Sequence, residues 1–124
     1  MAGKRILIAD DDQEILGVLE KRLRQNNNEV VGFSSGKEAI DKCKSFNPDL
    51  VILDMLLSDT DGYSVASALR KNKNLESVPI IFVTGQELDY SVSEKNISEL
   101  VNCFFLPKVS TFQDLLGKIK EKIG

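Results

Sequence analysis

Residues 4–12 read KRILIADDD, an apolar run that ends on three consecutive aspartates. An apolar run of this length with charged residues at its ends predicts a buried strand over Arg5–Ala9. Ionising one carboxylate makes it harder to ionise its neighbours, so three aspartates at a strand end are costly unless something positive lies among them. The stretch therefore raises the question of what Asp10, Asp11 and Asp12 hold.

Composition limits the classes of function that this chain can serve. Its 124 residues and 42% hydrophobic content suffice for one ordinary core, so we expect residues 1–124 to form a single domain. The formal net charge of -3 offers no basic excess for a phosphate backbone, and no direct nucleic-acid partner is expected. The chain contains no histidine, which removes histidine bases and imidazole metal ligands.

Cysteine spacing and hydropathy bear on the compartment. Cys43 and Cys103 fit neither a CxxC motif nor a zinc-ligand spacing, which predicts two buried thiols in a reducing environment. The sequence shows no apolar stretch long enough for a membrane span and no secretory signal pattern at its start. We therefore expect a cytoplasmic protein with no membrane partner.

Short apolar runs alternate along the chain with segments of helical periodicity. The runs predict strands over Arg5–Ala9, Glu29–Phe33, Asp49–Leu53, Val78–Thr84 and Asn102–Leu106. Helices are predicted around Ile15–Leu23, after a Ser35–Glu38 capping box, and over Gly62–Lys71, Leu88–Leu100 and Phe112–Ile123. Strands that are continuously hydrophobic and separated by single helices are typical of a parallel sheet covered on both faces. The pattern predicts a doubly wound α/β sheet.

In such sheets, functional groups gather beyond the carboxyl ends of the strands. The residues expected there are Asp10, Asp11, Asp54, Thr84 and Lys108. Three carboxylates at one edge would answer the opening question by holding a hard divalent cation such as Mg²⁺, whose open positions accept phosphate oxygens. A lysine and a threonine would then bind the phosphoryl oxygens, and Asp54 is the candidate nucleophile because it ends the central strand.

Each of these residues also has an ordinary structural interpretation. Asp12 followed by Glu14 fits a helix cap better than a metal ligand. One cap needs only one residue, so this interpretation is weaker for Asp10 and Asp11. Taken alone, Lys108 would be a surface charge and Thr84 an ordinary strand residue.

At this point the chain resembles the receiver domain of two-component response regulators. The matching segments are ILIADDD at 6–12, DLVILDMLLSDTDG at 49–62, VPIIFVTG at 78–85 and CFFLPK at 103–108. Each segment is weakly specific, whereas the four in this order and spacing are highly specific. The resemblance implies a flavodoxin-like (βα)5 fold with strand order 2-1-3-4-5 and phosphorylation of Asp54 by a histidine kinase or phosphotransfer protein.

The same resemblance implies roles for individual residues. Asp11 and Asp54 would bind Mg²⁺ through their side chains, Leu56 through its backbone carbonyl and Asp10 through water. Lys108 would pair with the phosphoryl group, and Thr84 would move to hydrogen-bond it. That movement would be coupled to Phe105, which lacks the hydroxyl of the more familiar tyrosine and can equally be a core residue.

The output surface implied by the resemblance comprises residues 88–100, 102–106 and 112–123. A downstream effector protein or domain would bind there, and a dimer formed on activation is compatible with the resemblance. The sequence does not distinguish a stand-alone regulator from one domain of a longer chain.

The sequence also departs from the family pattern. Val109 follows the lysine where the family usually has a proline, and Ser58 stands where proline is common. Leu56 and Gln86 occupy positions that, by analogy, set how fast water attacks the acyl phosphate. A leucine offers water no hydrogen bond, so we hypothesise a long-lived phosphoryl state.

Two rival functions stay open at the level of sequence. A pseudo-receiver would keep the fold as an interaction module without phosphotransfer; the complete set of aspartates, threonine and lysine argues against it, while Val109 and Leu56 favour it. A metal-dependent phosphatase could use Asp54 as its nucleophile, but such enzymes generally need an enclosing insertion for which this chain has no spare residues. We therefore expect no enzyme activity beyond self-phosphorylation from a phosphodonor and self-dephosphorylation.

Overall fold

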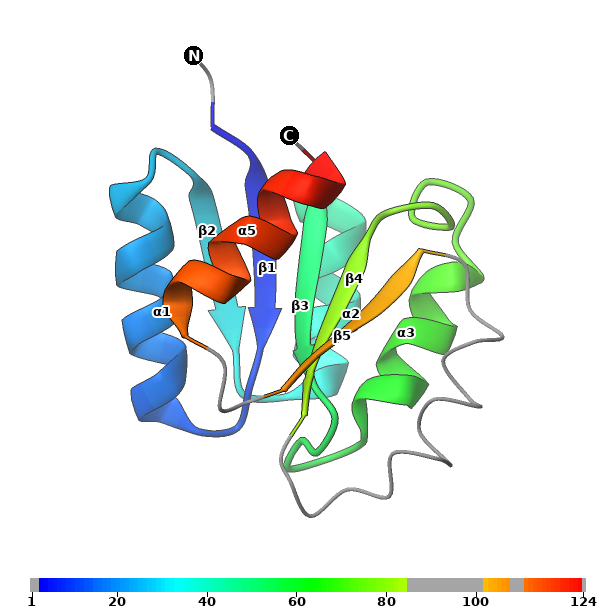
Figure 1. The fold of residues 1–124 in the computed structure, drawn as a ribbon. Helices are drawn as coiled ribbons and strands as arrows, with labels where there is room; N and C mark the ends of the chain where they lie inside the picture. Colours follow the sequence, from blue (N-terminus) through cyan, green and yellow to red (C-terminus); the bar gives the residue numbers. More distant parts are fainter. Residues whose placement is uncertain (1–2, 85–101, 108–110, 124) are drawn as a thin grey trace.

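The computed structural model describes residues 3–84, 102–107 and 111–123 of the chain, and Figure 1 labels its elements. The strands are β1 (Arg5–Ala9), β2 (Glu29–Phe33), β3 (Leu50–Asp54), β4 (Ile80–Thr84) and β5 (Cys103–Pro107). The helices are α1 (Gln13–Gln25), α2 (Gly36–Phe46), α3 (Gly62–Arg70) and α5 (Phe112–Ile123). The helix predicted over 88–100 lies outside the described residues.

The five strands form one parallel sheet in the order β2-β1-β3-β4-β5. The register places Ile6 opposite Leu50 and Val51 opposite Ile80. The chain moves outward from β1 to β2 and then returns to the other side of β1 with β3, so strand order reverses between β1 and β3. This arrangement confirms the predicted flavodoxin-like sheet, and the reversal point is where such folds place their ligands.

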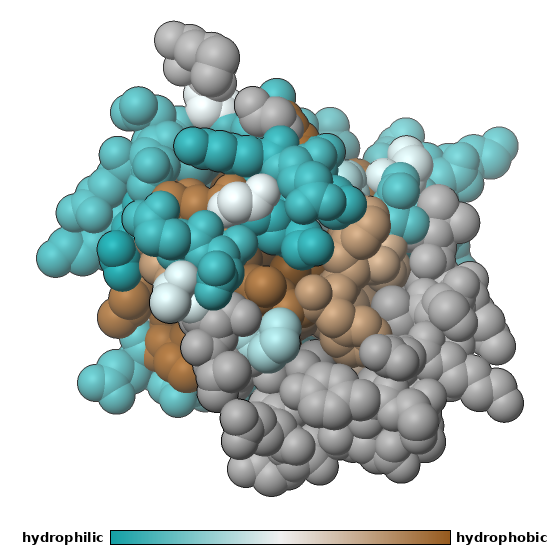
Figure 2. All heavy atoms as spheres, in the orientation of Figure 1, coloured by the Kyte–Doolittle hydropathy of each residue, from teal (hydrophilic) through white to brown (hydrophobic). Residues whose placement is uncertain are grey.

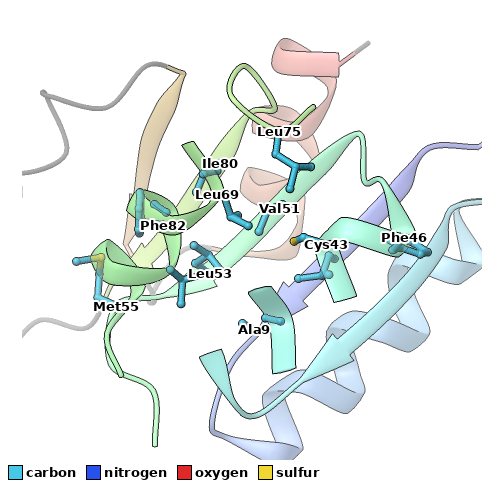
Figure 3. Packing of buried hydrophobic residues seen from close by; sticks show 14 residues of the cluster. Ala9, Cys43, Phe46, Val51, Leu53, Met55, Leu69, Leu75, Ile80 and Phe82 are labelled. Carbon is cyan, nitrogen blue, oxygen red and sulfur yellow. The ribbon is translucent and has the colours of Figure 1, made fainter. Parts of the chain in front are cut away.

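Helices cover both faces of the sheet, and each face has its own hydrophobic cluster. Ile6 and Ile8 of β1 face the cluster that includes α1 and α5, the helices on the near side of the sheet in Figure 1. Leu7 and Ala9 face the opposite cluster, which α2 and α3 cover. Figure 3 shows this second cluster, with Cys43 of α2 close to strand β3. Because β3 is buried along its whole length, Asp54 at its end lies on a rigid support.

Polar side chains fix where the helices begin. Asp12 accepts hydrogen bonds from the Glu14 and Ile15 amides at 3.0 and 3.2 Å, which confirms the cap interpretation for this aspartate. Ser35 accepts from the Glu38 amide at 3.3 Å, as the capping-box pattern predicted.

Three strands begin one or two residues later than the sequence predicted. Asp49 precedes β3; its carboxylate accepts a hydrogen bond from the Arg5 amide at 2.8 Å, and its own amide donates to the Arg5 carbonyl at 2.7 Å. Val78 precedes β4, and its carbonyl accepts a hydrogen bond from Arg70. Asn102 precedes β5 because its φ of 55° is left-handed and breaks the extended conformation.

The two thiols differ in burial. Cys43 is buried as predicted, whereas Cys103 is only half-buried, because it lies on the edge strand β5; both are free. Among the helices that the structure describes, none is long and apolar enough to cross a bilayer.

Candidate functional site

Three carboxylates meet at the carboxyl ends of β1 and β3. Asp10 and Asp11 follow β1 directly, and Asp54 is the last residue of β3. One oxygen from each side chain lies within 4.8 Å of the other two. Asp10 is 3% exposed and Asp54 6% exposed, whereas Asp11 is exposed to solvent. The predicted clustering of these aspartates is therefore present, with two members in the interior and one at the surface.

Backbone amides orient the two buried carboxylates. Asp10 accepts a hydrogen bond from the Asp12 amide at 2.9 Å, and Asp54 accepts one from the Leu56 amide at 3.3 Å. Both donors lie two residues after the carboxylate that they bind, so the turns that follow β1 and β3 hold the side chains in place. Carboxylate oxygens within 4.8 Å of one another could serve as ligands of a hard divalent cation such as Mg²⁺.

The remaining predicted site residues are described only in part. Thr84 is the last residue of β4, so its backbone lies at the same edge of the sheet as Asp54. Lys108 follows the end of β5 and lies outside the described residues, as do Gln86 and Val109.

Phe105 lies in β5 and packs against the core. Its ring centroid is 6.0 Å from that of Phe82, with a tilt of 42° between the ring planes. The side chain is half-buried against the cluster beneath α2 and α3. This packing agrees with the core interpretation of Phe105, and its role as a switch stays a prediction.

The sequence did not predict the cavity that opens beside the carboxylates. It measures about 270 Å³ and runs between α1 and α5, with Asp10 and Asp54 in its lining. Its lining also includes Arg22 and Phe112, and the Arg22 guanidinium lies 4.2 Å from the Phe112 ring centroid. Figure 2 shows hydrophobic surface over the lower part of α1, a helix whose Val18 is 50% exposed. Such a cavity depends on how two distant helices pack, which no local sequence pattern records.

Leu56 is the other large hydrophobic residue exposed in the described part of the chain. Its side chain is 60% exposed although it lies only two residues after the buried Asp54. Its backbone pairs with Asp61 across the loop between β3 and α3. The binding of Mg²⁺ by the Leu56 backbone carbonyl stays a prediction.

Comparison with known proteins places these features in a family. The model of the response regulator receiver domain matches residues 6–120. The alkaline phosphatase synthesis transcriptional regulatory protein PhoP of Bacillus subtilis is 33% identical over 88 residues. That match covers 71% of this chain and 36% of the relative, so the chain spans about a third of that protein's length.

Several solved structures of similar fold are receiver domains. The receiver domain of the sensor histidine kinase PA1611 from Pseudomonas aeruginosa, solved with magnesium in its active-site cleft, has a TM-score of 0.87 at 28% identity, covering 99% of both chains. The non-phosphorylated HemR receiver domain from Leptospira biflexa has a TM-score of 0.84 at 27% identity, covering 98% of this chain and 94% of that one. On the family match, the related sequence and the shared fold, this chain belongs to the response regulator receiver domain family.

Proposed function

We propose that this chain is a phosphorylation-dependent signalling receiver of a two-component system, with Asp54 as the phosphoacceptor. The observation that supports this best is the grouping of the Asp10, Asp11 and Asp54 oxygens within 4.8 Å. Asp54 is the candidate nucleophile because it ends the central strand of the sheet, and carboxylates form acyl phosphates.

Mg²⁺ fits the donor set at this site. Carboxylate oxygens are its preferred protein ligands, and it keeps positions open for water or phosphate. The PA1611 receiver domain was solved with magnesium in its cleft. In this chain Asp11 and Asp54 would bind the ion directly, together with the Leu56 carbonyl, and Asp10 would bind it through water. Bound Mg²⁺ would offset the repulsion among the carboxylates and the charge on the phosphoryl oxygens.

The phosphodonor in this proposal is a phosphohistidine on a histidine kinase or a phosphotransfer protein, because the chain has no histidine of its own. An Asp54 oxygen forms a bond to phosphorus as the P–N bond breaks, and the imidazole nitrogen keeps the electron pair of that bond. Lys108 and Thr84 would bind the transferred phosphoryl oxygens. Their roles rest on the sequence resemblance alone.

The proposed output is a change of partner at a surface away from Asp54. It would comprise residues 88–100, β5 and α5, with Thr84 and Phe105 coupling it to the phosphoryl group. The partner would be an effector protein or domain, and a dimer on phosphorylation is part of the same proposal. We also propose that residues 1–124 are one cytoplasmic receiver domain, since the family match runs from 6 to 120.

Phosphorylation with a small donor tests this proposal directly. We would incubate the protein with Mg²⁺ and acetyl phosphate and measure intact mass for wild type, Asp54→Asn and Asp49→Asn. Asp49 is a suitable control because it is an exposed aspartate at the opposite end of β3. Wild type and Asp49→Asn should gain one phosphoryl group, and Asp54→Asn none. A folded wild type that gains no phosphoryl group in the presence of Mg²⁺ would favour the pseudo-receiver function instead.

A further inference from the structure

Asp59, in the loop between β3 and α3, binds the first turn of a different helix, α2. Its Oδ2 atom accepts hydrogen bonds from the Ser35 hydroxyl at 2.8 Å and the Lys37 amide at 3.1 Å. Its Oδ1 atom accepts from the Gly36 amide at 2.8 Å. These bonds, that of Gly36 foremost, lower the pKa of Asp59 to about 2. The carboxylate is therefore ionised at neutral pH and joins two elements that are 22 to 24 residues apart.

The loop and α2 also pack closely around this contact. A Cβ atom added at Gly36 would lie 2.3 Å from the Thr60 methyl group, so a larger residue there would force this contact to shift. On the other side of Asp59, the Ser58 hydroxyl donates to the Ser34 carbonyl at 3.3 Å. Packing and hydrogen bonds thus hold the loop against α2 on both sides of Asp59.

The loop that Asp59 anchors also contains the backbone next to Asp54. Within it, the Leu57 amide donates to the Thr60 carbonyl at 3.0 Å and closes a tight turn around Asp59. Leu56 lies immediately before this turn, and its amide binds the Asp54 carboxylate at 3.3 Å. A movement of Asp59 would therefore shift Leu56 through only two intervening residues.

Asp59 differs from the ordinary caps of this protein. Asp12 and Asp61 each cap the helix that they directly precede. The helix that Asp59 binds already has its own cap in Ser35. Asp59 binds the Gly36 and Lys37 amides, whereas Ser35 binds the Glu38 amide, so Asp59 completes the cap of α2 and in addition sets the position of the loop.

We propose that Asp59 is a positioning residue, which holds the loop after Asp54 against α2 and thereby fixes the backbone carbonyl of Leu56. The inference rests on the proposed function, because it concerns that carbonyl as a ligand of Mg²⁺. Groups that orient a metal ligand without touching the ion typically change metal affinity about 10- to 100-fold when they are removed. Asp59 acts through backbone and on one ligand, so we expect a change of about tenfold.

Magnesium titration of the full chain by calorimetry, with amide hydrogen exchange in its absence, tests this role. The variants are Asp59→Ala, Asp59→Asn and Asp49→Ala. Asp49 is the matched control. Its exposed carboxylate also accepts a hydrogen bond from a backbone amide, that of Arg5 at 2.8 Å, but it lies at the far end of β3 from Asp54. Asp59→Asn keeps the shape of the side chain and one acceptor oxygen, in case Asp59→Ala fails to fold.

We expect Asp59→Ala to bind Mg²⁺ about tenfold more weakly than wild type, and the hydrogen of its Leu57 amide to exchange faster. Asp49→Ala should match wild type in Mg²⁺ affinity and in exchange rate. Asp59→Asn should fall between them. Wild-type Mg²⁺ affinity in the folded Asp59 variants would overturn the role of Asp59 and leave the proposed function intact. An equal loss of affinity in Asp49→Ala would also overturn it, because general destabilisation would then explain the effect. Failure of wild type to bind Mg²⁺ would overturn the proposed function itself.

Discussion

The backbone amide of Leu56 donates a 3.3 Å hydrogen bond to the Asp54 carboxylate, while the Leu56 side chain is 60% exposed. The residue that orients the candidate phosphoacceptor thus also carries an exposed apolar side chain two residues away from it in sequence. A leucine can neither donate nor accept a hydrogen bond, so it gives an attacking water no orientation. This relationship supports the hypothesis of a long-lived phosphoryl state.

Replacing Leu56 by asparagine should accelerate dephosphorylation. A hydrogen bond to the attacking water worth about 1.4 kcal/mol in the transition state corresponds to about a tenfold faster rate. The measurement is the loss of phosphoryl mass from Asp54 after the phosphodonor has been removed. Leu56→Met is the control, since it changes the shape of the side chain without adding a comparable polar group. Equal rates in all three proteins would contradict a role for this side chain.

Gly36→Ala should destabilise the fold by about 1–3 kcal/mol, the usual cost of overpacking. The added Cβ would lie 2.3 Å from Thr60 Cγ2 and 2.9 Å from Val65 Cγ2, both on or near the loop that Asp59 anchors. Urea unfolding measures the change. Gly17→Ala in α1 is the control, because nothing lies within 4 Å of its added Cβ and alanine favours a helix by up to about 1 kcal/mol. A neutral Gly36→Ala would mean that the loop gives way easily.

The sequence predicted the architecture well because local patterns encode it. β1 and β2 have the predicted bounds, since charged or turn residues lie at both ends of each apolar run. The positions of Asp10 and Asp54 followed from a general rule about parallel sheets rather than from their neighbours in sequence. The strand order was implied by the family resemblance and was confirmed by the structure.

Contacts between distant segments could not be predicted in this way. Asp59 reads as one polar residue in a loop, and only the fold brings it to Ser35 and Gly36. The start of β4 was misplaced for a similar reason, because the Val78 carbonyl is bound by Arg70 from α3. Local propensity records neither contact, since each joins segments whose proximity arises only after the sheet has formed.

Arg70 should contribute measurably to stability through its hydrogen bonds to backbone carbonyls. From the end of α3 its guanidinium donates to the Leu75 carbonyl at 2.8 Å and the Val78 carbonyl at 2.7 Å. Arg70→Met should lower the free energy of unfolding by about 2–3 kcal/mol, as expected for hydrogen bonds from a charged group. Arg70→Lys should recover less than half of this free energy, because an ammonium group lacks the planar arrangement of N–H donors that lets a guanidinium bind two carbonyls at once. Urea unfolding beside the exposed control Lys71→Met measures this, and a full recovery by lysine would contradict it.

The two thiols should react at very different rates in the folded protein. Burial raises the pKa of Cys43 to about 12, so almost no thiolate forms near neutral pH. Burial also raises the pKa of Cys103, but Arg70 opposes the shift and the side chain is half-buried. A disulfide reagent should modify Cys103 first and Cys43 only on unfolding. The first phase should vanish in Cys103→Ala, and two equally fast thiols would show that the core opens readily.

Acid should remove the contribution of Asp59 to stability within a defined range of pH. Its pKa falls from an ordinary value of 3.8 to about 2 in the folded protein, chiefly through the Gly36 amide, so the unfolded chain binds this proton more readily. The stabilisation is therefore fully present above the unfolded pKa and is lost as the pH falls through the folded one. We would measure thermal unfolding of wild type and Asp59→Asn from about pH 5 down to about pH 2. The difference between their Tm values should become smaller as the pH falls. The other carboxylates are the same in both proteins, so their effect cancels in this difference. A Tm difference that stays constant with pH would mean that Asp59 does not hold the loop through its charge.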